Sequence, residues 1–234
     1  MTDGRGRVVA VVAAVLLLGG TACTAGAPEK ADPAPPSLRA GLLTADRLPQ
    51  GYTLNTSEVE STTTRAPSAT STYVPNTDPL ESMPCSELGI TSFLTTHAKP
   101  LEDVAVGLER EPVGDDDFGW GGQEVLDRYP PGRAAAVLDA VSAAVGRCAE
   151  FSTVLFDGSV SQESATATRD GDSLRVRITS MPPPDGVHPW VDETAFVRFG
   201  DVVLTVQQVG TDRPTDDLRT VLDAAVRAYR ARED

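Results

Sequence analysis

The chain has 234 residues and a formal net charge of −14 at pH 7, from 34 acidic and 20 basic side chains. A surface this acidic repels phosphate backbones, so we expect no nucleic-acid partner. The length suits one domain with a single sizeable core. Lys30 and Lys99 are the only lysines, and with the abundance of Ala, Gly, Val and Asp this bias indicates a GC-rich, actinobacterial source.

Residues 1–22 have the pattern of a removable export signal, with two arginines before an apolar run that is too short to span a bilayer. Small residues lead directly to Cys23, which resembles a bacterial lipoprotein signal, although Gly20 stands where that family usually has Leu. In such proteins the cysteine is acylated, for example with palmitate, and becomes the mature N-terminus. The alternative is ordinary cleavage after Ala27, which would discard Cys23. We expect lipidation of Cys23, which would anchor the protein to the extracytoplasmic face of the cell membrane.

Two cysteines remain once Cys23 is lipidated. Cys85 and Cys148 are an even pair in an oxidising compartment, so we expect a disulfide between them. Two buried thiols or a metal site are the alternatives. Two cysteines with only His97 and His188 make a poor ligand set, so we expect no metal.

In chain order, residues 23–36 are rich in Pro and Ala and predict a disordered tether, and the domain then covers residues 37–234. A short helix is expected after Ser37. Residues 55–82 are rich in Ser and Thr and are expected to be irregular. Alternating apolar residues predict a strand over 103–110, and residues 123–129 are expected to form a second strand.

A proline pair at 130–131 marks the start of a helix, because proline lacks an N–H and fixes φ. Apolar residues then recur at three- and four-residue steps up to Cys148, which predicts one buried stripe. A strand over 153–157 follows. Asp170-Gly171 and Gly200-Asp201 each predict a two-residue hairpin turn, joining strands over 162–169 and 173–180, and over 194–199 and 202–209. Residues 215–229 predict a last amphipathic helix.

These elements predict an α+β fold: a single domain in which an antiparallel sheet of about six strands packs, on one face, on two long helices, with one disulfide. The outward sheet positions are then expected to include six polar residues, with Leu174, Val176, Leu204 and Val206 as their inward neighbours: Thr166, Thr168, Arg175, Arg177, Thr205 and Gln207.

Several segments in this order carry a family resemblance: residues 42–52 (LLTADRLPQGY), Cys85, the strand ending at Tyr129, the Ala-rich helix ending at Cys148, and the hairpin at Arg198–Val203. The chain resembles the extracellular sensor domain of mycobacterial receptor serine/threonine kinases of the PknH type, here as a free-standing lipoprotein. The resemblance implies one α+β domain with a cleft for an unknown ligand. That family typically has two disulfides, whereas this chain can form only one.

The sequence has no nucleophile elbow, P-loop, zinc motif or dinucleotide fingerprint. We therefore expect no enzymatic activity and no cofactor. His97 and His188 lie in polar stretches and are interpreted as surface histidines, which leaves little support for a catalytic triad. The acidic run 115–117 is interpreted as a solvated turn in preference to a Ca²⁺ site, because no second acidic cluster accompanies it.

Trp120 and Trp190 each stand beside Gly or Pro in a predicted loop, where an indole forms either a lid over the sheet or the wall of a pocket. We predict that a small ligand, glycan or peptide binds in a groove bordered by both, away from the helix-covered face. The predicted function is a sensor-like extracytoplasmic lipoprotein that binds an unidentified ligand. The alternative is a structural or protein-interaction lipoprotein of the cell envelope without a small-molecule ligand.

Overall fold

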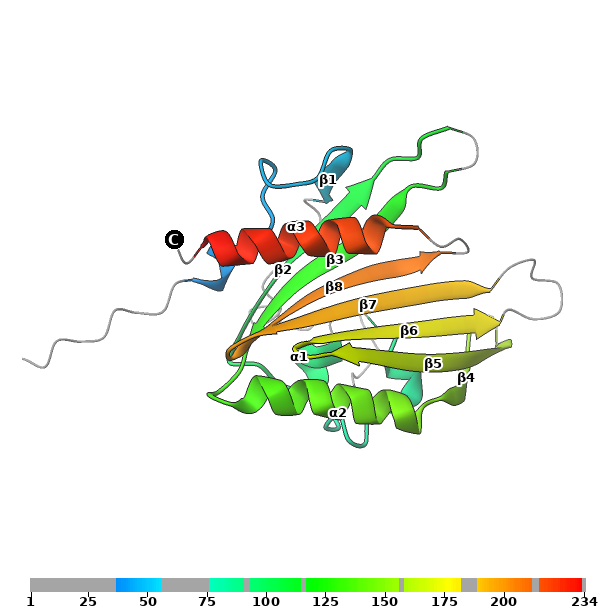
Figure 1. Ribbon diagram of the computed structural model, residues 1–234. Coiled ribbons are helices and arrows are strands. Elements are labelled where there is room, and N and C mark those ends of the chain that lie inside the picture. Colours follow the sequence, from blue (N-terminus) through cyan, green and yellow to red (C-terminus); the bar gives the residue numbers. More distant parts are fainter. Residues whose placement is uncertain are drawn as a thin grey trace, which may run out of the picture. The chain divides into compact units, whose positions relative to one another are not determined.

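An antiparallel sheet organises the computed structural model, which describes residues 37–55, 76–90, 93–114, 117–155, 158–181, 189–211 and 215–232. In this part of the chain eight strands pair in the order β1-β2-β3-β8-β7-β6-β5-β4 (Figure 1). Their bounds are Tyr52–Asn55 (β1), Glu102–Arg110 (β2), Trp120–Arg128 (β3), Glu150–Val154 (β4), Val160–Asp170 (β5), Ser173–Met181 (β6), Trp190–Phe199 (β7) and Val202–Thr211 (β8).

The described residues also form three α-helices, which are Phe93–His97 (α1), Arg133–Arg147 (α2) and Asp217–Ala231 (α3). Short 3-10 turns cover Leu38–Gly41 (η1) and Cys85–Glu87 (η4). The buried residues of α2 recur at three- and four-residue spacing, as the sequence predicts, and so do those of α3. Within the described residues, no helix has both the length and the apolar character that crossing a bilayer requires.

The helices α2 and α3 pack on opposite faces of the sheet. Neighbouring residues of a strand point to opposite faces. In β8, Val203 belongs to the apolar cluster of α2, whereas Leu204 belongs to the cluster of α3. Phe196 and Ala195 divide between the same two clusters in β7. We call the two sides the α2 face and the α3 face; Figure 1 shows α3 in front of the sheet and α1 behind it.

The expected fold of about six strands packed on one face against two long helices is therefore wrong. In the described ranges the sheet has eight strands, and the three α-helices are short, with 5, 15 and 15 residues. Strand β1 was not predicted, because four residues are too few to show a clear alternating pattern. The error about the faces has a different cause: an apolar stripe shows that a helix packs on a sheet, but not on which side. Burial of every residue from Val202 to Gln208 reflects cover on both faces.

Both predicted hairpins form. Phe199 pairs with Val202, so the turn is Gly200-Asp201 as predicted, with Gly200 at φ 58° in the left-handed region that favours glycine. In the other hairpin Asp170 pairs with Ser173, which makes the turn Gly171-Asp172, one residue later than predicted.

Candidate functional site

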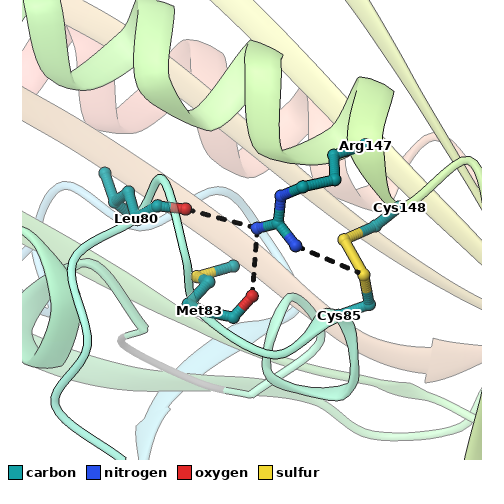
Figure 2. The surroundings of a disulfide bond; sticks show 5 residues. All are labelled: Leu80, Met83, Cys85, Arg147 and Cys148. Atoms are coloured by element: carbon teal, nitrogen blue, oxygen red, sulfur yellow. Dashed lines mark hydrogen bonds between the residues drawn. A yellow bond between two sulfur atoms is a disulfide. The ribbon is translucent and has the colours of Figure 1, made fainter.

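The predicted disulfide is present and joins the end of α2 to η4. Cys148 directly follows the last residue of α2, and its Cα lies 5.4 Å from that of Cys85. Figure 2 shows the Arg147 guanidinium beside this bond. Its Nη2 donates to the carbonyl of Met83 at 3.0 Å and to that of Leu80 at 3.5 Å. One covalent bond and one charged side chain therefore hold the same irregular segment against α2.

The Cys85–Cys148 disulfide and the Arg147 hydrogen bonds are together called the clamp below. The segment that follows Cys85 lies on the α2 face of the sheet. Leu88 is buried, and the carbonyl of Gly89 accepts a hydrogen bond from Nε2 of Gln207 at 3.1 Å. A Cβ added to Gly89 would lie 3.7 Å from Cδ1 of Ile178, a residue of the α2 core. The clamp thus helps to position residues 88–90 above strands β6 and β8.

Trp190 lies on the same face, at the end of the sheet where β7 begins. Its side chain is 53% exposed. The indole rests against Gly210 of β8, where an added Cβ would stand only 2.8 Å from Cε3 of Trp190. Only glycine leaves room for this approach. Asp192, two residues further along β7, accepts a hydrogen bond from the backbone N–H of Gly210.

A row of polar side chains crosses the sheet beside this indole. Glu163 of β5 pairs with Ser180 of β6, and Ser180 pairs with Trp190. Asp192 lies diagonally next to Ser180, because its partner is Ile178. These four residues, Glu163, Ser180, Trp190 and Asp192, are called the Trp190 surface below.

Both carboxyl groups of the Trp190 surface have a raised pKa. For Glu163 the main cause is partial burial, which hydrogen bonds from side chains including Ser180 oppose. For Asp192 burial is again the largest cause, followed by the negative charge of Glu163. Carboxyl groups accept hydrogen bonds from hydroxyl and amine groups, and an exposed indole stacks on the apolar side of a sugar or peptide. The Trp190 surface therefore offers both kinds of contact.

Trp120 is a core residue on the opposite side of the sheet. It is 7% exposed and belongs to the apolar cluster of the α3 face. Its Nε1 donates to Oε1 of Gln208 at 3.0 Å, and its ring meets that of Tyr52 edge-on at 5.7 Å. The structure therefore does not bring Trp120 and Trp190 together, and the two indoles do not border one groove.

The expected grouping of outward polar positions is also wrong in part. Thr205 and Gln207 are buried on the α2 face, the same side as Leu174 and Val176. The other four residues do share one exposed surface, on the half of the α3 face formed by β5 and β6: Thr166, Thr168, Arg175 and Arg177. Pairing between strands determines which residues of different strands share one face of the sheet. This pairing cannot be predicted from the alternation within a single strand.

The sequence analysis missed an ion-pair network around Arg110. This guanidinium lies between two carboxylates, with Nε 2.9 Å from Oδ1 of Asp217 and Nη2 3.1 Å from Oδ1 of Asp117. Tyr52 also donates to Asp217. Hydrogen bonds from Arg110, then from Val113 N–H, hold the pKa of Asp117 well below its usual range. This network joins β1, β2, the loop before β3 and the start of α3, and nothing in the local pattern signals it.

The structure describes one of the two histidines, His97, and its partners are a backbone carbonyl and a carboxylate. His97 is buried, which corrects the expectation of a surface histidine. Its Nδ1 lies 2.6 Å from the carbonyl of Asp78 and its Nε2 lies 2.7 Å from Glu87. Among the residues that the structure describes, no group of three or more His, Cys, Asp or Glu side chains could hold a metal ion. Three other residues of interest lie outside the described ranges: Cys23, Asp115 and His188.

No protein-family model matches the chain, and no curated protein matches it. Among solved structures, the chain is similar to the extracellular domain of PknH from Mycobacterium tuberculosis. The alignment has 14% sequence identity, covers 65% of this chain and 76% of that chain, and gives a TM-score of 0.45. A likeness of this strength leaves the ligand, activity and partners of this chain to be inferred from its own residues.

Proposed function

We propose that the protein is an extracytoplasmic lipoprotein, anchored to the cell membrane through Cys23, whose domain binds a ligand. The signal-like residues 1–22 and the cysteine that follows them support export and lipidation. The Cys85–Cys148 disulfide supports an oxidising compartment, because such bonds are rare in the cytosol.

The Trp190 surface is the proposed binding site, and the exposed indole is the observation that carries this proposal. A large aromatic side chain that is 53% exposed and rests on a glycine leaves one ring face available for stacking. The adjacent carboxyl and hydroxyl groups would bind hydroxyl or amine groups of the same ligand. A glycan or peptide fragment combines these features, and fragments of the cell wall are accessible to a protein outside the cytoplasm.

Tryptophan fluorescence tests this site directly, because the chain has only two tryptophans and Trp120 is buried. Titrating soluble peptidoglycan fragments onto the domain is expected to give a saturable change in emission. Trp190→Ala is expected to weaken binding at least tenfold, measured by calorimetry, while the melting temperature changes by no more than about 2 °C.

Leu101→Ala is the matched control, since Leu101 is 66% exposed and precedes β2 at the other end of the sheet. This variant should bind like the wild type. Wild-type affinity in Trp190→Ala would contradict the proposed site.

A structural or protein-interaction role is the second candidate, and exposed apolar residues near the edge strand β4 favour it. Val154 pairs with Val160, and both side chains are exposed, as is that of Met181 on β6. Edge strands with exposed apolar side chains can pair with another chain. A wild-type protein that gives no fluorescence response to any cell-wall fragment would favour this role.

Lipidation is tested separately by replacing the acceptor residue. Cys23→Ala is expected to move the protein from the membrane fraction to the soluble fraction, or to leave the precursor uncleaved, because two acyl chains anchor a protein stably. Mass spectrometry of the mature N-terminus measures the modification, and Thr24→Ala serves as the control. An unmodified native N-terminus at Pro28 would contradict lipidation and favour cleavage after Ala27.

A further inference from the structure

The short strand β4 forms one edge of the sheet. On its inner side it pairs with β5, from Glu150 opposite Ser164 to Val154 opposite Val160. On its outer side no other strand of the described ranges pairs with it (Figure 1). A strand edge of this kind can add a strand from another chain, because its outward N–H and C=O groups are available for a second ladder.

The hydrogen bonds between β4 and β5 identify which residues of β4 face outward. At one end the Ala165 N–H donates to the carbonyl of Ala149, and at the other the Leu155 N–H donates to the carbonyl of Ser159. Hydrogen-bonded pairs alternate along an antiparallel ladder. Every second residue from 149 to 155 therefore directs its backbone groups to β5, and the residues between them direct theirs away from the sheet.

Glu150, Ser152 and Val154 are these outward residues. All three are exposed, Val154 to 71%. The hydrogen bonds of the described chain include none to their outward N–H and C=O groups. Natural edge strands are commonly protected by proline, by lysine or by a bulge. β4 contains neither residue, and its register with β5 is regular, so this edge has none of the three protections.

The outer edge of β4 is complementary to itself. When two copies lie antiparallel with Ser152 opposite Ser152, Glu150 of each lies opposite Val154 of the other. All outward residues then fall in hydrogen-bonded pairs, each of which exchanges two N–H···O bonds. The two glutamates are kept apart, because each faces a valine. Phe151 lies opposite Thr153 of the second copy, and such aromatic and β-branched pairs stabilise antiparallel sheets.

We propose that the protein forms a two-fold symmetric dimer through β4, with the axis between the two Ser152 residues. This dimer deepens the protein-interaction role of β4 by naming a second copy of the chain as the partner. The register described above, in which no like charges meet, favours a second copy. Anchoring in one membrane, where lipidation occurs, would also raise the local concentration of copies. The net charge of −14 opposes association, so added salt should strengthen the dimer.

The dimer has a consequence for the Trp190 surface, and this part rests on the proposed ligand function. Glu163 of that surface lies opposite Phe151 of β4 on the same face. β7 is three strands from β4, so the two Trp190 residues would be seven strand spacings apart across one continuous sheet, or roughly 34 Å. A polymeric cell-wall fragment could then contact both copies, and a short fragment only one.

Cross-linking of the full chain in intact cells tests the symmetry. Residues opposite each other in a hydrogen-bonded pair have Cα atoms about 5.5 Å apart. Ser152→Cys is therefore expected to give a covalent dimer with a short bis-maleimide. Thr166→Cys is the matched control, because this exposed residue lies on β5, away from the outer edge, and it should stay monomeric. Equal yields from both variants, or none from Ser152→Cys, would overturn the proposal.

A charge exchange distinguishes a second copy from any other occupant of the edge. Val154→Glu would face Glu150 of the second copy, and it is expected to weaken dimerisation at least tenfold because the symmetry applies the repulsion twice. Adding Glu150→Lys to this variant should restore the dimer. Val113→Glu is the control, since Val113 is 77% exposed in the connection between β2 and β3, and it should dimerise like the wild type.

Sedimentation equilibrium of the purified full chain measures these dissociation constants. Trp190→Ala should dimerise normally, so a failure of the ligand site and a failure of the dimer can be told apart. The proposal is contradicted if the wild-type chain remains monomeric up to about 1 mM, which corresponds to a very weak association. It is also contradicted if Val154→Glu dimerises as tightly as the wild type, because a different surface would then form the contact.

Discussion

Glu124→Gln is expected to stabilise the domain at pH 8 and to leave its stability nearly unchanged at pH 5. The Glu124 side chain is completely buried on the α3 face, where one oxygen accepts the Leu43 N–H at 2.8 Å. Burial raises its pKa to about 8, although the Leu43 hydrogen bond opposes this. Glutamine keeps the hydrogen-bond acceptor and cannot ionise.

The direction of this pH effect on stability follows from proton binding by the folded and unfolded states. The folded state keeps the Glu124 proton up to pH of about 8, whereas the unfolded chain releases it near its ordinary value of 4.5. The stabilisation of the folded state that protonated Glu124 provides is therefore fully present below about pH 4.5, and it is lost as the pH rises to about 8. At about 1.4 kcal/mol for each unit of pKa difference, the loss is on the order of 4 kcal/mol, or roughly 10 °C in melting temperature.

Thermal unfolding of both proteins from pH 5 to pH 8.5 measures this effect. The wild type should lose stability across this range more steeply than Glu124→Gln. Glu150→Gln, at an exposed carboxyl group at the start of β4, should follow the wild-type profile. Parallel profiles for the wild type and Glu124→Gln would show that Glu124 does not titrate in this range.

Removing the disulfide is expected to have an effect of similar size. The bond closes a loop between residues 63 apart, which corresponds to about 4 kcal/mol in the chain-entropy model. The double variant Cys85→Ala/Cys148→Ala should therefore unfold at a lower urea concentration. Reduced wild-type protein should behave in the same way.

Hydrogen exchange should locate the change. Residues 76–90 are expected to lose protection first, whereas β5 to β8 should keep theirs, because each of these strands has neighbours on both sides. Arg147→Ala in the oxidised protein is the comparison, and it should loosen residues 80–83 only slightly while the disulfide remains. Equal loss of protection across the sheet would contradict a local role for the clamp.

Local features of this protein can be predicted from its sequence, because they depend on interactions between residues that are close in the chain. The proline pair before α2 and its three- and four-residue apolar spacing indicate the helix correctly, and the turn at Gly200-Asp201 depends on glycine at a positive φ. The disulfide follows from cysteine count and compartment, without any knowledge of geometry.

The candidate sites were predicted less well. Trp120 and Trp190 have similar sequence surroundings, but cross-strand pairing places one in the α3 core and the other on the exposed end of the α2 face. Exposure and pairing depend on residues far away in the chain, so neither could be predicted from local pattern.

Most of the strands, the two 15-residue helices and the Cys85–Cys148 pairing can be predicted from the amino-acid sequence, because these features depend on neighbouring residues or on composition. Three features emerge only when the chain packs: α2 and α3 cover opposite faces, Arg110 joins Asp117 to Asp217, and Glu124 is buried. Alternation along a strand defines two faces without saying what covers each one. That choice is made when distant elements pack, since the free energy of burial depends on the whole arrangement.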